Sequence, residues 1–231
     1  MEQLNIIYYL IFATAVFASA LFLYLSSNKS KRILVLLSII AIVQSIISST
    51  NFYNDSTSIP PRFLLLVLPS FIIVASALSI KRYREICLNF NVKYLILIHT
   101  VRILVEVVLH ALYEVKLIPQ QMTYEGSNFD VLFALSAIVV YYLYTNHKIS
   151  RKALMIWNIV GLIFLINIVV TSVISAAGPQ QLIAFEQPNK AVMYFPFSLL
   201  PSVIVPIVLF SHILLLMKFI ALVREDFILP K

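Results

Sequence analysis

The chain of 231 residues is 61% hydrophobic and only 12% charged, with a formal net charge of +7. A soluble globular domain has about 25% charged residues, so the composition excludes a water-soluble fold. A positive net charge can indicate nucleic-acid binding, but here the basic residues lie in connections between apolar stretches. We therefore expect a lipid bilayer, and no nucleic acid, as the partner.

Apolar stretches long enough to cross a bilayer as helices account for nearly the whole chain. A membrane-spanning helix needs about 20 mainly apolar residues, and no segment is left over for a soluble domain. The sequence predicts an all-α polytopic membrane protein, a seven-transmembrane-helix bundle that forms a single transmembrane domain over residues 1–231. The predicted spans are 5–26, 33–50, 62–80, 94–116, 130–146, 153–177 and 199–223.

The first span contains Ala18-Ser19-Ala20, which resembles a signal-peptide cleavage site. No Lys or Arg precedes the apolar run, and the run continues to Leu25, so we expect a retained span. Cys87 is the only cysteine, and it follows the third span. This excludes an internal disulfide and a cysteine-rich metal site.

Basic residues are concentrated in alternate connections, which predicts an orientation. The connections after the first, third and fifth spans are rich in them, whereas Arg62, Lys116 and Lys190 stand one in each of the other three. Because basic residues gather on the cytoplasmic side, we expect the N-terminus outside, the C-terminus in the cytoplasm, and a multi-pass location in the plasma (inner) membrane. The residues concerned are Lys29, Lys31, Arg32, Lys81, Arg82, Arg84, Lys93, Lys148, Arg151 and Lys152.

The fourth span carries a stripe of ionisable residues: His99, Arg102, Glu106 and His110. Their spacing of three, four and four places them within roughly 80° of one another on one helix face. Charged groups at membrane depth are costly and usually face the bundle interior or a water-filled cavity. The stripe is therefore the predicted site for a ligand or an ion. The span contains neither Gly nor Pro, so we expect a straight helix.

Two interpretations of the stripe remain open: a working site for a ligand or an ion, or a purely structural set of contacts. Arg102 and Glu106 are four residues apart, so an ion pair within the helix is available. In the structural interpretation this pair is inert, and the two histidines bond to neighbouring helices. Against it stands the cost of about 2.5–3.5 kcal/mol for inserting one Arg or acid at the centre of a membrane helix.

The outward connections are the longer ones, so we expect any mouth on the outer face. Residues 120–130 form the most irregular stretch. Asp130 stands where an N-cap or first-turn acid would open the fifth span. We favour this capping role over a role in binding.

The seventh span contains Pro201 and Pro206, which predict a kink. His212 follows near the middle of the span, and we expect it to join the site. Asn158 and Asn167 in the sixth span face roughly opposite ways, so at most one of them points at the stripe.

These residues can be compared with those of two classes of membrane protein, the retinal proteins and the metal-dependent membrane hydrolases. A retinal protein needs a buried lysine near the middle of its seventh helix, and Lys218 lies too near the cytoplasmic end. A metal-dependent membrane hydrolase is open, with Glu106, His110 and His212 as a two-histidine, one-carboxylate metal site. Such a protein would resemble the seven-helix ceramidase and adiponectin-receptor-like group. That group pairs two histidines four apart on its last helix, whereas Val208 and Leu216 occupy those positions here.

Transport of a small ligand, or of an ion coupled to protons, is the function we favour from the sequence. A track of histidine, arginine and glutamate across a membrane suits proton relay or anion binding. A seven-helix sensor or ligand-binding receptor and the metal-dependent hydrolase are the alternatives. No motif indicates a cofactor, an enzyme activity or an oligomeric state.

Overall fold

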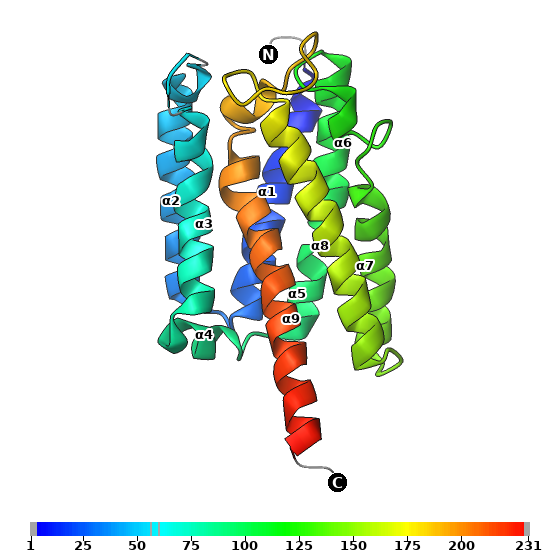
Figure 1. Ribbon diagram of the computed structural model, residues 1–231. Coiled ribbons are helices and arrows are strands. Elements are labelled where there is room, and N and C mark those ends of the chain that lie inside the picture. Colours follow the sequence, from blue (N-terminus) through cyan, green and yellow to red (C-terminus); the bar gives the residue numbers. More distant parts are fainter. Residues whose placement is uncertain (1–3, 56, 60, 229–231) are drawn as a thin grey trace.

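The computed structural model describes residues 4–55, 57–59 and 61–228, with side chains as far as Ile220. The described part is a bundle of helices that run nearly parallel or antiparallel (Figure 1). This confirms the predicted all-α fold class. Its α-helices are α1 (Ile6–Ser26), α2 (Lys31–Ser49), α3 (Phe63–Ser79), α4 (Lys81–Cys87), α5 (Val92–Ile98), α6 (Val101–Glu114), α7 (Asp130–Thr145), α8 (Arg151–Ile174) and α9 (Val205–Ile228). Shorter helical turns are η1 (Phe52–Asn54), η2 (Gln120–Met122), η3 (Ala191–Met193) and the π-helical η4 (Leu200–Ile204).

Five spans in the described part are long and apolar enough to cross a membrane: α1, α2, α5 with α6, α8, and η4 with the first part of α9. Helices α3 and α4 would form a sixth, but the chain bends by 88° between them. The remaining apolar helix, α7, has 16 residues, which is shorter than the roughly 20 that a span needs.

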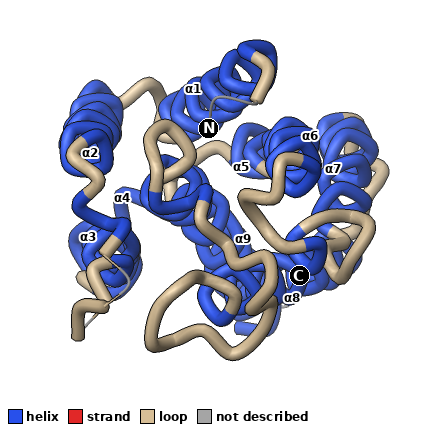
Figure 2. The backbone as a smooth tube through the Cα atoms, turned by 90° about the horizontal axis from the view of Figure 1, so that it is seen from above, coloured by secondary structure: helices blue, strands red, loops and turns tan. Residues whose placement is uncertain are grey.

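The helices fall into a core and a peripheral hairpin. Seen along the bundle, α2 and α3 stand to one side, while α1, α5 to α8 and α9 are grouped together (Figure 2). The span formed by α5 and α6 is 67% buried, compared with 17% for α2. The stripe residues therefore belong to the most enclosed span of the bundle.

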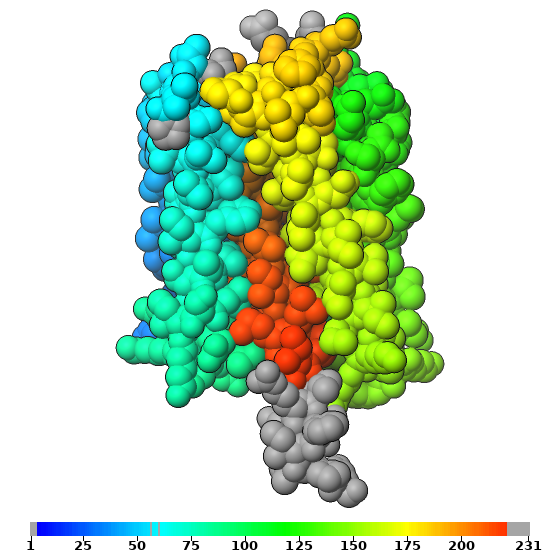
Figure 3. All heavy atoms as spheres, in the orientation of Figure 1, coloured from blue at the N-terminus to red at the C-terminus, as the bar shows by residue number. Residues whose placement is uncertain are grey.

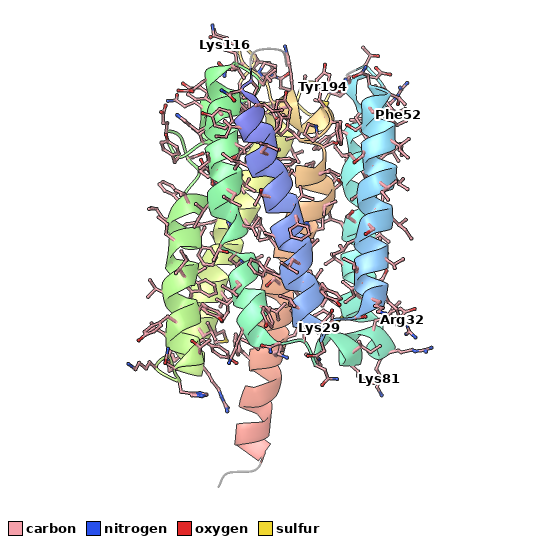
Figure 4. The ribbon with its side chains drawn as sticks, turned by 180° about the vertical axis from the view of Figure 1, so that it is seen from behind. Lys29, Arg32, Phe52, Lys81, Lys116 and Tyr194 are labelled. Atoms are coloured by element: carbon pink, nitrogen blue, oxygen red, sulfur yellow. The ribbon has the colours of Figure 1, made fainter. Side chains whose placement is uncertain are left out.

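Basic residues from alternate connections lie at the same end of the bundle. Figure 4 shows Lys29, Arg32 and Lys81 at one end, and Lys116 at the opposite end. This is the distribution on which the predicted orientation depends.

The expected straight fourth helix is interrupted at His99 and Thr100, where α5 gives way to α6. In a regular α-helix the His99 amide would donate to the Leu95 carbonyl. The Ser211 hydroxyl of α9 donates to that carbonyl instead (2.8 Å), and the His99 amide turns to Ile96 O (3.2 Å). A contact from another helix therefore breaks the span without any Gly or Pro.

The predicted kink of the last span takes the form of the π-helical turn η4, which joins α9 at Val205. Pro206 has no amide hydrogen, so the Ser202 carbonyl, four residues before it, has no α-helical donor. The Ser70 hydroxyl of α3 donates to this carbonyl. The proline thus opens the helix, and a serine of the peripheral hairpin satisfies the group that is freed.

Candidate functional site

A buried ion pair joins Arg102 of α6 to Asp130 at the start of α7. The Arg102 Nε donates to Asp130 Oδ2 at 2.9 Å, and Nη2 donates to Oδ1. The Arg102 side chain is 4% exposed and that of Asp130 10%. The expected pairing of Arg102 with Glu106 is wrong, because both parallel donors of the guanidinium go to Asp130.

The short length of α7 explains how Asp130 reaches Arg102. Its 16 residues rise only about 24 Å, and the helix begins well below the C-terminal end of α6 (Figure 1). Asp130 is confirmed as a first-turn acid, where the positive end of the helix dipole favours it. Its carboxylate also serves as the counter-ion of Arg102, which the capping role did not predict.

Glu106 accepts its hydrogen bonds from the segment 120–130, which folds inward over it. Oε1 accepts from the Tyr124 amide at 2.7 Å, and Oε2 accepts from the Asn128 side-chain amide. The same Asn128 amide nitrogen also donates to Met122 O at 3.0 Å, while its Oδ1 accepts from the Asp130 amide. The segment 120–130, where we expected a mouth, is therefore a cap that holds the Glu106 carboxylate.

His212 of α9 lies beside Arg102, as we expected from its depth in the span. Its Nε2 is 3.4 Å from Arg102 Nη1, and its Nδ1 is 2.8 Å from Asn158 Oδ1. Because a guanidinium only donates, Nε2 must be the acceptor and the proton must sit on Nδ1. His212 therefore fits this network as a neutral imidazole.

The His99 ring packs against that of His212, with centroids 4.1 Å apart and the ring planes tilted by 36°. Its Nε2 lies 3.4 Å from the hydroxyl of Ser211. That hydroxyl already donates to Leu95, so His99 Nε2 is the donor here and Nδ1 is an unprotonated acceptor. Nδ1 is buried and has no hydrogen-bond partner in the described structure.

His110, the last member of the stripe, lies at the rim of the bundle, near the C-terminal end of α6. Its ring stacks on Tyr124 (centroids 4.7 Å apart) and lies 3.6 Å from Glu114 and 3.7 Å from Glu125. Desolvation, and then the carboxylates of Glu125, Glu114 and Glu106, raise the pKa of the Tyr124 phenol. Through Tyr124 and Glu125, His110 contacts the cap rather than the Arg102 network.

Aromatic rings close the network on the side of α7 and α8. Phe133 stacks on Trp157 (centroids 4.6 Å apart), and the Arg102 guanidinium lies 5.0 Å from the Phe133 ring centre. Gly161 of α8 makes room for Phe133, because a Cβ there would lie 2.0 Å from Phe133 Cζ. Its carbonyl also accepts from Arg102 Nη1 at 3.4 Å.

A narrow cavity reaches this network from the side of the bundle. Figure 3 shows the surface hollowed between α3 and α8, with α9 at the floor. The cavity holds about 740 Å³ of space free of protein atoms, its open side included, of which about 70 Å³ is wide enough to centre a water molecule. Its polar lining is Arg102, Glu106, Asn128, Asp130 and Ser172; its apolar lining includes Phe63, Val67, Phe71, Val105, Leu109, Met122, Leu165, Val169, Val173, Leu200, Ile204 and Val208.

The geometry does not assemble the metal site that we considered from sequence. In the part of the chain that the structure describes, no group of three or more His, Cys, Asp or Glu side chains is placed to hold a metal ion. Of the three residues concerned, Glu106 contacts the cap, His110 the rim and His212 the Arg102 network.

A family model described as "Domain of unknown function (DUF8737)" matches residues 59–220. The chain belongs to this family. The DUF8737 match covers α3 to the described side chains of α9, and with them every residue of the polar network. Helices α1 and α2 lie outside it. No curated protein and no solved structure matches the chain.

Two residues of the network were missed as site residues: Asn128, and Asp130 in its role as counter-ion. The fifth predicted span, 130–146, is the shortest of the seven. Its length is at the lower limit for a membrane-spanning helix, so a start below the level of its neighbours would place the acid at its first position at membrane depth, where it needs a cation. That signal was present in the sequence.

Proposed function

We propose that this DUF8737 protein transports a small amphiphilic molecule that enters its cavity sideways from the bilayer. The observation that carries the proposal is the shape and lining of the cavity. It is apolar along its length and ends at the buried network of Arg102, Asp130 and Glu106. Ligand sites commonly combine a mainly apolar lining with a few placed polar groups.

The narrowness of the cavity favours a single chain over a bulky ring. The space that the centres of water molecules can occupy is about 70 Å³, which admits a few waters at about 10–15 Å³ for each. So small a volume suits a single alkyl chain better than a bulky ring. The two helices that flank the open side carry exposed apolar residues, such as Leu64 of α3 and Ile166 of α8, so such a chain could enter from lipid.

Two interrupted helices beside the cavity support transport rather than static binding. One interruption lies between α5 and α6, next to Arg102, and the other is the π-helical η4, whose Pro201 and Ile204 line the cavity. Transporters often build their central sites from broken membrane helices. π-Helical turns are frequent at functional sites.

The proposal includes the seven-span topology with the N-terminus outside and the C-terminus in the cytoplasm of a plasma membrane. Cysteines at Ser127 and Ser30, introduced singly in a Cys87→Ser background, test it in intact cells. An impermeant maleimide should label position 127 and leave position 30 unlabelled until the cells are opened. Labelling of position 30 in intact cells would reverse the orientation.

Binding is tested in phosphatidylcholine vesicles with dodecanol that carries a bromine beside its head. Trp157 is the only tryptophan and stacks on Phe133 at the polar end, so bound bromine should quench it. Simple partition into lipid gives quenching that never saturates; a bound probe adds a saturable part. Val169→Phe, which fills the cavity, should remove the saturable part, whereas the lipid-facing Val170→Phe should keep it.

Transport is measured in the same vesicles with bromine-labelled lysophosphatidylcholine added to the outer leaflet. Its transfer to the inner leaflet is followed by extraction with albumin. We expect faster transfer than in empty vesicles, and loss of the acceleration in Val169→Phe but not in Val170→Phe. Equal rates in the parent and in empty vesicles would refute transport.

A further inference from the structure

We infer that the polar end of the ligand is a cation, an amine or a quaternary ammonium group, which pairs with Glu106. This inference rests on the proposed function, because it names the chemical class of the molecule that enters the cavity. It depends on which charges at the end of the cavity already have a partner.

The charge of Arg102 is already compensated. Its Nε and Nη2 both donate to the Asp130 carboxylate, and Nη1 lies against Gly161 O and His212 Nε2. An anionic head group would have to compete with a bidentate buried carboxylate for this guanidinium. The cavity therefore offers little to an anion, although an arginine lines it.

Glu106 is in the opposite situation. Its two oxygens accept from the amides of Tyr124 and Asn128. The contacts of Asn128 with Met122 O and with the Asp130 amide fix which end of its side chain points at Glu106. Both oxygens are thus acceptors, which suits a carboxylate; a neutral carboxyl would satisfy the same two bonds only by pointing its O–H into the cavity.

In the described part of the chain, no Lys, Arg or His forms an ion pair with this carboxylate. Arg102 is held by Asp130, His110 lies near Glu114 and Glu125, and His212 fits as a neutral ring. A buried charge without a partner is costly. The carboxylate lines a cavity with an apolar wall and an open side, so a cation on an apolar chain would complete the ion pair.

The test compares competitors that share a dodecyl chain and differ only in the head. Dodecyltrimethylammonium, dodecanol and dodecyl sulfate are titrated against the saturable quenching of Trp157 by the brominated dodecanol. In the parent we expect the cation to compete about tenfold more tightly than the alcohol, equivalent to about 1.4 kcal/mol, and the sulfate to compete most weakly.

Glu106→Gln is the decisive variant, and Glu114→Gln is its matched control. Both remove one negative charge from α6, but the Glu114 side chain is 63% exposed at the rim. Glu106→Gln should bring the cation and the alcohol to within about twofold of each other while keeping the saturable quenching. Glu114→Gln should preserve the preference. If Glu106→Gln fails to fold, the order of the three heads in the parent still decides.

The outcomes separate this inference from the proposed function. Saturable binding with no difference among heads, or with the sulfate tightest, would overturn the cation while leaving the binding cavity in place. The absence of any saturable quenching in the parent would overturn the proposed function itself. If Glu106→Gln kept the preference for the cation, a group other than Glu106 would be its partner, and the inference would be wrong.

Discussion

The core span α5–α6 and the peripheral hairpin α2–α3 use buried polar residues in different ways. In the hairpin these residues are neutral, and each makes a single contact: Gln44 with Tyr53, Ser48 with Met193 O, and Ser70 with Ser202 O. In the core they are ionisable and linked, as Arg102 is to both Asp130 and His212. Neutral contacts are enough to hold a helix in place; the ionised network belongs to the cavity.

The largest effect should come from breaking the core ion pair. Arg102→Leu leaves Asp130 as a buried carboxylate without a partner, which costs about 3–5 kcal/mol. Adding Asp130→Asn should recover more than half of this loss. The measurement is unfolding by SDS in mixed micelles, followed by the fluorescence of Trp157. If Glu106→Leu restored the stability of Arg102→Leu and Asp130→Asn did not, the partner of Arg102 would be Glu106, as the spacing on the helix suggested.

A smaller effect should come from the wall of the network. Gly161→Ala brings a Cβ against the Phe133 ring, and overpacking of this kind costs about 1–3 kcal/mol. Phe133→Leu should relieve the clash, so the double variant should be more stable than Gly161→Ala alone. The same unfolding measurement applies, and additive losses in the double variant would show that the ring is not what Gly161 accommodates.

In the hairpin, removing one neutral contact should cost less. Ser70→Ala removes the side-chain donor to the Ser202 carbonyl, and a hydrogen bond between membrane helices contributes about 0.6–1.7 kcal/mol. In a Pro206→Ala background the restored amide can donate to that carbonyl, so the cost of Ser70→Ala should shrink there. Ser49→Ala is the control, because the Ser49 hydroxyl bonds only within its own helix.

The smallest effect is expected in the connection between η1 and α3, outside the spans. Hydrogen bonds from the Thr57 hydroxyl and amide, and then the charge of Arg62, lower the pKa of the exposed Asp55 carboxyl. A lowered pKa in the folded state contributes stability above the ordinary value of 3.8, and this contribution is lost as pH falls through the lower folded pKa. Asp55→Asn should therefore remove a small contribution to stability that is constant between about pH 5 and 8 and fades at more acidic pH, as followed by the same unfolding measurement. Equal stability of parent and variant in that range, or a difference that grows as the pH falls, would contradict the assignment.

Much of the fold followed from apolar length and from charge asymmetry. The helix bounds agree with the predicted spans to within a few residues for α1, α2 and α8. The interruption at His99 and Thr100 was not predictable from the span itself, because it depends on Ser211, which is more than 100 residues away in the sequence. The interruption of the last span was predictable from the sequence, because it contains Pro201 and Pro206.

For the candidate site, the sequence placed the right residues on α6 but paired them wrongly. Spacing within one helix showed that Arg102 and Glu106 could meet. It could not show that each has a better partner on the segment 120–130, because that depends on how far the chain folds back into the bundle. His212 was expected beside the stripe and lies 3.4 Å from Arg102. His110 shares the helix face but lies at the rim.

The most direct test of the account is a crystal structure grown with a bromine-labelled dodecyltrimethylammonium. Bromine at the far end of the chain gives an anomalous signal that marks where the chain ends. We predict a peak in the cavity among Phe71, Val173 and Val205, with the ammonium group beside Glu106 and the Arg102–Asp130 pair unchanged. Peaks confined to the lipid-facing surfaces of the helices, with the cavity empty, would contradict the central claim.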